Sequence, residues 1–244
     1  MTDKNTVGEG AASASPKKKG LKLTPRKLTV AGVAAVVIAV GGFAFWEWHE
    51  TPQFCAAICH NMDPYLETYM QEDNVPGTDK YGNPVSDTSA MLATRHRENP
   101  STTRPEMRCM ACHHPVLAEQ VSEVVMQVSG NYYDPLTERV GNDLTHWEGI
   151  KSTQFCANEN CHSYLMDENG DINRDKLESI TVSRKFNPHA QHHPDMQLEC
   201  TECHKGHRAS VMVCSGCHED AEMPSGWVSY DEGQKILERA YGKR

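Results

Sequence analysis

The ten cysteines of this 244-residue sequence fall into five close pairs, and each pair is followed directly by a histidine. Disulfide bonds and zinc sites give no reason for a histidine at that one place. Paired thiols with a following histidine are typical of haem c attachment: the thiols form thioethers with the haem, and the histidine binds its iron. The five motifs are Cys55-Cys59-His60, Cys109-Cys112-His113, Cys156-Cys161-His162, Cys200-Cys203-His204 and Cys214-Cys217-His218.

The spacing between the two thiols differs among the motifs. Three pairs have the usual gap of two residues, the Cys156 pair has four intervening residues, and the Cys55 pair has three. The two thiols must reach two vinyl groups of one haem, so a gap near one helical turn is required. We predict five haems c, with four as the alternative if the Cys55 motif is not loaded.

A second axial ligand is needed for each six-coordinate iron that transfers electrons. Eight histidines remain after the five motifs, and the sequence also offers methionines. Histidine with a neutral ring is a good iron ligand. We expect four or five of these eight histidines to be second ligands; they are His49, His96, His114, His146, His189, His192, His193 and His207.

Bound haem also explains the composition. Apolar residues make up 38% and aromatic residues 7% of the chain, which is little for a protein of this length. We therefore expect a mostly α and irregular fold, a multihaem cytochrome c whose core is dominated by haem. Apolar spacing and turn residues predict helices at 90–97, 115–128 and 233–241, and a loop at 75–86.

The elements that position this domain begin with an uncharged segment at residues 28–46. Its length suits one N-terminal transmembrane helix, and the preceding residues 1–27 carry a net charge of +5. We predict a basic cytoplasmic tail at 1–27, an anchor in the cytoplasmic membrane at 28–46, and an extracytoplasmic multihaem domain at 47–244. A cleaved signal peptide is the alternative, although its apolar stretch is normally shorter.

The C-terminal part of the chain resembles the tetrahaem domain of flavocytochrome c fumarate reductases. The matching residues run from Asn187-Pro188-His189 through the Cys200 and Cys214 motifs to Trp227. This resemblance implies that His189, His192 and His207 are distal haem ligands. The adjacent His193 is an extra histidine beside His192.

The N-terminal half is similar to the membrane-anchored quinol dehydrogenase cytochromes of the NapC/NirT/NrfH type. Those proteins have one anchor helix closely followed by a C-x-x-C-H-x-M motif, and Cys59-His60-Asn61-Met62 has the same ending. The resemblance implies menaquinol-type quinols as electron donors and Met62 as a candidate ligand. Candidate proton acceptors near the first motif are Glu47, His49, Asp63, Glu67 and Lys80.

The predicted function is to take electrons from membrane quinol and pass them through the haems to a separate FAD-containing reductase subunit of the fumarate reductase type. Only 27 residues follow Cys217, too few for a flavin domain in the same chain. Alternatives are a terminal haem reductase of a small oxyanion such as nitrite, and a relay to another cytochrome. The net charge of −14 beyond residue 27 favours a partner with a basic patch and argues against a nucleic-acid partner.

An acidic segment between Asp167 and Glu178 has the oxygen-ligand spacing of an EF-hand calcium loop. Ile172 stands where that loop requires glycine, and Arg174 lies between the ligand positions. An ordinary acidic turn is the simpler interpretation, with calcium as the alternative.

Overall fold

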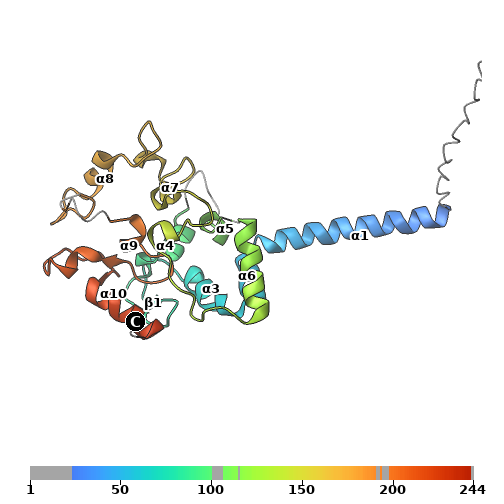
Figure 1. The fold of residues 1–244 in the computed structure, drawn as a ribbon, viewed down its shortest axis with the longest axis horizontal. Helices are drawn as coiled ribbons and strands as arrows, with labels where there is room; N and C mark the ends of the chain where they lie inside the picture. The colour runs from blue at the N-terminus through green and yellow to red at the C-terminus, as the bar shows by residue number, and fades with distance from the viewer. Residues whose placement is uncertain (1–23, 101–106, 115, 191–192, 194–197, 243–244) are drawn as a thin grey trace, which may run out of the picture. The chain divides into compact units, whose positions relative to one another are not determined.

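The computed structural model describes residues 24–100, 107–114, 116–190, 193 and 198–242, apart from the His60 side chain (Figure 1). The chain divides into two units, Met1–Trp46 and Glu47–Arg244. The first unit contains most of α1, Pro25–His49, whose residues are exposed up to Trp48. Among the described residues, α1 is the one helix long and apolar enough to cross a bilayer, by a test that signal sequences also pass.

The second unit consists of short helices joined by long irregular segments. Its α-helices are α2 Pro52–Ile58, α3 Asp63–Met70, α4 Leu92–Glu98, α5 Cys109–Cys112, α6 Leu117–Ser129, α7 Ser152–Cys156, α8 Arg174–Ile180, α9 Cys200–Cys203 and α10 Tyr230–Tyr241. The 3₁₀ turns are η1 His60–Met62, η2 Thr88–Ala90, η3 Gly141–Asp143, η4 Ser163–Leu165 and η5 Val213–Gly216. The expected fold class, mostly helical and irregular with one N-terminal apolar helix, is confirmed.

Strands are very short in the described part of the chain. β1 Gly77–Thr78 pairs antiparallel with β2 Pro84–Val85, so the expected loop at 75–86 contains a small hairpin. β3 Val211–Met212 pairs parallel with β4 Val228–Ser229 just before α10. The three helices expected from periodicity are present as α4, α6 and α10, with ends that differ by up to three residues.

The interior of the second unit holds few apolar side chains. Its buried apolar cluster comprises Val85, Met91 and Ala209, with Val228 packed against it. The largest side chains that are almost fully buried are, apart from Met91, all hydroxyl-bearing: Thr68, Thr88, Thr94, Thr145, Ser152 and Ser210. A domain of this size needs more apolar burial than these side chains provide, so much of its core has to come from a bound group.

Helices α3 and α4 are joined by side chains that bond to helix ends. The Arg97 guanidinium of α4 donates to the Tyr69 carbonyl at 2.6 Å and to the Gln71 carbonyl at 2.7 Å, where α3 ends. The Thr94 hydroxyl donates to the Thr68 carbonyl at 2.7 Å. Carbonyls at a helix C-terminus lack intrahelical partners, so these bonds fix the two helices side by side.

Candidate haem-binding sites

Each described attachment motif forms a tight turn that holds its thiols near one another. Two of the C-x-x-C motifs are single helical turns, α5 and α9, and the third begins inside η5 and ends at Cys217 directly after it. In all three, the histidine backbone N–H donates to the carbonyl of the first cysteine, with N···O distances of 2.8 to 2.9 Å. A cysteine pair at positions i and i+3 therefore lies on one face of the turn.

The longer Cys156 motif closes in the same way. The His162 N–H donates to the Cys156 carbonyl at 3.1 Å, although two more residues lie between them. The extra residues form a small loop in which the Asn158 side chain accepts from the Asn160 N–H at 2.9 Å. The Cys55 motif differs, because the Cys55 carbonyl accepts from the Cys59 N–H at 2.9 Å.

Four of the motif histidines face a second histidine from elsewhere in the chain. The ring centroids are separated by 6.4 Å for His113 and His207, 6.1 Å for His162 and His96, 6.3 Å for His204 and His189, and 6.0 Å for His218 and His193. Figure 1 shows the elements around these residues, including α4, α5 and α9, within the second unit.

This separation fits an iron between the two rings. Metal–imidazole bonds are about 2 Å long, and each bonded nitrogen lies about 1 Å from its ring centroid, so two axial imidazoles have centroids about 6 Å apart. Aromatic rings in direct contact span about 4.5–7 Å, so the distance is compatible with an iron, and the repeated pairing of a motif histidine with a second histidine is what favours one. The residues present therefore fit four bis-histidine haem sites.

Hydrogen bonds fix the ring orientation of three histidines that face a motif histidine: His96, His189 and His207. The Leu92 carbonyl lies 2.8 Å from Nδ1 of His96, and the Leu177 carbonyl lies 3.2 Å from Nδ1 of His189. A carbonyl only accepts, so Nδ1 carries the proton in both rings. The lone pair is then on Nε2, which is the nitrogen available for iron.

His207 is oriented by a threonine rather than by a carbonyl. Its Nδ1 lies 2.7 Å from Oγ1 of Thr68. The Thr68 hydroxyl has a single proton, which it donates to the Tyr65 carbonyl at 2.9 Å. The His207 Nδ1–H is consequently the donor to Thr68, and Nε2 is again the ligand nitrogen.

The protonation of these rings also suits metal binding. Burial lowers the pKa of His207 to about 3 and that of His204 to about 4. Burial lowers the pKa of His162 and His189 as well. Burial disfavours the charged imidazolium, so these rings are neutral and keep the lone pair that an iron ligand requires.

A buried ion-pair cluster holds the segment that carries His204 and His207. Lys205 Nζ lies 2.8 Å from Oε1 of Glu138, and Arg208 Nε lies 2.6 Å from Oε2 of the same carboxylate. All three side chains are at most 14% exposed. Burial alone would raise the pKa of Glu138, but its bonds to Arg208 and Lys205 outweigh burial and lower the pKa to about 2.

The attachment cysteines of neighbouring motifs lie close to one another. Cys55 and Cys109 share a side-chain hydrogen bond, and so do Cys156 and Cys200. Cys112 is within electrostatic range of Cys156, and Cys214 is within range of Cys203. The five motifs thus form a continuous series in the order of the sequence.

The other predicted ligands are placed differently. His114 lies 2.6 Å from Glu148, and its ring contacts Phe155. His146 is exposed and contacts Trp147. Neither faces a motif histidine in the described contacts. Met62 ends η1, and its relation to the His60 ring, like the whole of His192, lies outside what the structure describes.

His193 is a residue that the sequence reasoning did not single out. It faces His218. The resemblance to the flavocytochrome domains could not decide between His192 and His193 as a ligand. The adjacency of His192 and His193 was the one available signal, since a one-residue shift in register moves the ligand from one histidine to the other.

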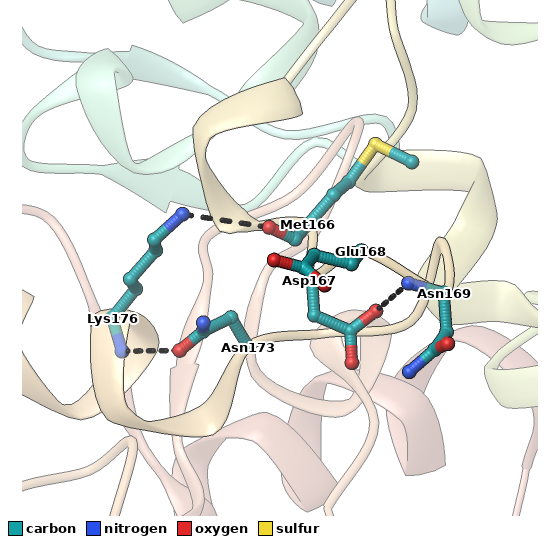
Figure 2. Close-up of a pocket in the computed structure, with 6 residues that line it drawn as sticks. All are labelled: Met166, Asp167, Glu168, Asn169, Asn173 and Lys176. Atoms are coloured by element: carbon teal, nitrogen blue, oxygen red, sulfur yellow. Dashed lines mark hydrogen bonds between the residues drawn. The ribbon is translucent and has the colours of Figure 1, made fainter.

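The acidic segment considered for calcium forms a compact turn (Figure 2). Oδ1 of Asp167 accepts from the Asn169 and Asp171 N–H groups at 2.8 and 3.0 Å, and Asn173 caps the start of α8. In the part of the chain that the structure describes, no group of three or more His, Cys, Asp or Glu side chains lies close enough to hold a metal ion. The oxygens are engaged within the turn itself, which favours the simpler interpretation.

One known protein is similar to this chain over most of its length, and a family profile and a second protein match parts of it. A family profile for cytochrome c3 matches residues 142–219. The cytochrome c-type protein Cgr1 of Eggerthella lenta is 48% identical over 208 residues, covering 85% of this chain and 89% of that protein. The chain belongs to this family of multihaem c-type cytochromes.

A second relative extends the comparison. The acrylate reductase cytochrome subunit of Shewanella woodyi is 34% identical over 88 residues, covering 33% of this chain and 67% of that protein. No solved structure matches the chain. As a multihaem c-type cytochrome, the protein binds haem c covalently and takes part in electron transport. Membership of the NapC/NirT group is not among these findings.

Proposed function

We propose that this cytochrome binds five haems c through its ten motif cysteines, with His60, His113, His162, His204 and His218 as proximal ligands. The proposed distal ligands at the second, third, fourth and fifth motifs are, in that order, His207, His96, His189 and His193. The ring separations of 6.0 to 6.4 Å support these four assignments. The first haem has His60 on one side and Met62 as the candidate on the other.

The proposed role is to carry electrons from membrane quinol to a separate reductase. The observation that carries this proposal is the continuous series of attachment sites, which starts at Cys55 and ends at the Cys214 motif. Bound haems supply one-electron carriers at these sites. Cys55 lies only nine residues after Trp46, the last residue of the proposed anchor. The first site is therefore proposed to lie at the membrane surface, where quinol headgroups reside.

Quinol oxidation releases protons as well as electrons, so a proton acceptor is needed near the first site. Among the candidates, Asp63 and Glu67 are exposed, whereas burial lowers the pKa of Lys80 to about 8. The Lys80 ammonium donates to the Tyr65 hydroxyl at 3.3 Å, in the helix that follows His60. With a pKa of about 8, Lys80 is neutral in a fraction of molecules near neutral pH and can then accept a proton; it lies within electrostatic range of His113 and His207, beside the second site.

The electron acceptor is proposed to be an FAD-containing reductase on the extracytoplasmic side. The Shewanella relative is the cytochrome subunit of an acrylate reductase, and the match to it supports an arrangement with separate cytochrome and reductase chains. The resemblance of the C-terminal part to flavocytochrome tetrahaem domains supports a flavin partner.

The donor half of the proposal is tested with the full chain in nanodiscs. Menadiol is added anaerobically, and haem reduction is followed by the absorbance of the reduced haem band. We expect menadiol to reduce the wild-type haems on the time scale of a rapid-mixing experiment. The Lys80→Met variant should contain the same amount of haem and should be reduced more slowly. A wild-type protein that dithionite reduces but menadiol does not would exclude quinol as the donor.

The acceptor half is tested on the reduced protein. A purified flavin-dependent reductase of the fumarate reductase type and its substrate should reoxidise the haems, whereas the substrate alone should not. Rapid reoxidation by nitrite without any added protein would instead favour the terminal reductase. The four facing histidine pairs argue against that alternative at the second to fifth motifs, because an open iron position is needed to bind nitrite.

A further inference from the structure

Helix α6 exposes its apolar side chains rather than burying them. Within Leu117–Ser129, the exposed fractions are 74% for Leu117, 56% for Val121, 57% for Val124, 60% for Val125 and 83% for Val128. Spacings of three and four residues put these five side chains on one face of the helix. We refer to Leu117, Val121, Val124, Val125 and Val128 as the α6 stripe.

The opposite face of α6 is polar and is turned toward the haem sites. Oε1 of Glu119 accepts from Arg139 at 2.7 Å and lies within electrostatic range of His113. Glu123 lies within range of both Cys55 and Cys59. Residues 119 and 123 are about half a turn around the helix from the stripe. The residues that would hold the first two haems are therefore on the side of α6 that faces away from the stripe.

Helix α6 also lies beside the segment that follows α1. Cys55 belongs to α2, which begins at Pro52, three residues after α1 ends at His49. The side chains of Cys55 in α2 and Cys109 in α5 lie next to each other, and α6 starts five residues after Cys112. The stripe is thus on an element held next to the first residues outside the proposed membrane anchor.

We propose that α6 is an interfacial helix whose stripe lies in the surface of the lipid bilayer. An apolar face of this kind sinks about 5–10 Å into the boundary between headgroups and acyl chains. The proposal rests on the membrane anchor at residues 28–46. It adds a second membrane contact, so that the haem domain is held against the bilayer with the Cys55 motif at the level of the quinol headgroups.

The charge of α6 specifies the kind of lipid contact. The helix contains Glu119 and Glu123 and no lysine or arginine. Attraction to anionic headgroups, which strengthens many interfacial helices, is therefore absent here. Contact depends on apolar area alone, so it occurs on zwitterionic phosphatidylcholine and is insensitive to salt.

Photolabelling from the lipid tests this inference. The full chain with its haems is placed in phosphatidylcholine nanodiscs that contain a phosphatidylcholine with a diazirine in the upper acyl chain. After illumination and digestion, labelled peptides are mapped by mass. We expect labels on α1 and α6 and none on α10, Tyr230–Tyr241, an amphipathic helix that buries Gly233 and Ile236. Raising salt from about 0.05 to about 0.5 M should leave the pattern unchanged.

A pair of matched variants shows whether the stripe causes the labelling. Val128→Asp changes a valine that is 83% exposed, and Val182→Asp makes the same change at a valine that is 73% exposed outside α6. Both should keep the wild-type low-spin haem spectrum, because neither side chain is buried. Val128→Asp should reduce α6 labelling about tenfold, as expected for losing the burial of one valine, whereas Val182→Asp should leave it unchanged.

The possible outcomes separate the inference from the anchor on which it rests. An unlabelled α1 would overturn the anchor and with it this inference. A labelled α1 with an unlabelled α6 in a monomeric protein would leave the anchor standing and refute the interfacial helix. If nanodiscs hold two chains of the wild type but one chain of Val128→Asp, the stripe joins two copies of the protein. That result also refutes lipid contact.

Discussion

Replacing Glu138 by glutamine should destabilise the haem domain by about 3 kcal/mol. The pKa of Glu138 falls from 4.5 to about 2 through Arg208 and Lys205, and each pKa unit corresponds to about 1.4 kcal/mol. Loss of one partner from a buried ion pair costs about 3–5 kcal/mol, because the remaining charges stay buried. Glutamine keeps the shape of the side chain and removes only the charge.

The pH dependence of this loss follows from the direction of the pKa shift. A carboxyl whose pKa is lowered by folding contributes stability that is fully present above its unfolded pKa of about 4.5. That contribution disappears as the pH falls from about 4.5 to about 2. The difference between wild type and Glu138→Gln should therefore be largest near neutral pH and should vanish near pH 2.

Guanidinium unfolding of the haem-loaded protein, followed by haem absorbance, measures this difference. Glu232→Gln is the matched control, because its pair with Arg239 at 2.9 Å is 42% and 52% exposed and should contribute less than about 1 kcal/mol. Glu138→Gln should also show high-spin haem at lower denaturant concentration, since Lys205 and Arg208 flank His204 and His207. A loss below about 1 kcal/mol at pH 7, or one that persists at pH 2, would refute the reasoning.

Three further predictions concern the haem ligands. His193→Ala should convert one haem to the high-spin form in the absorption spectrum, whereas His146→Ala should leave every haem low-spin. Thr68→Val should remove the acceptor for Nδ1 of His207 and weaken its iron bond about 10- to 100-fold, seen as a partly high-spin spectrum with unchanged total haem. The intact mass should equal the chain plus five haems; a mass with four, together with an unmodified peptide containing Cys55, would contradict the assignment of the first motif.

The sequence predicted the chemistry of this protein better than its local structure. Cysteine and histidine spacing indicates haem attachment directly, because the two thioether bonds require thiols close enough together to reach both vinyl groups of one haem. Helices α4, α6 and α10 were expected because their apolar spacing or turn signals are local features. The hairpin of β1 and β2 was expected only as a loop, since two-residue strands leave no alternating pattern to detect.

Pairing of distal histidines with motifs could not be predicted from sequence. His207 lies three residues after His204 but faces His113, 94 residues earlier. Such pairings depend on how α3, α4 and the segment at Lys205 are held together, through contacts such as that between Thr94 and Thr68. The sequence reveals how many ligands are available, and only the three-dimensional arrangement assigns each one.

The small apolar cluster of Val85, Met91 and Ala209 has a consequence for how the protein is made. With so little side-chain packing, the chain should gain its compact state only as haem is attached, so folding should follow covalent attachment of haem. Cells short of haem should then accumulate no stable apoprotein, because the unfilled chain remains open to proteases. The abundance of this cytochrome is therefore set by haem supply as well as by gene expression.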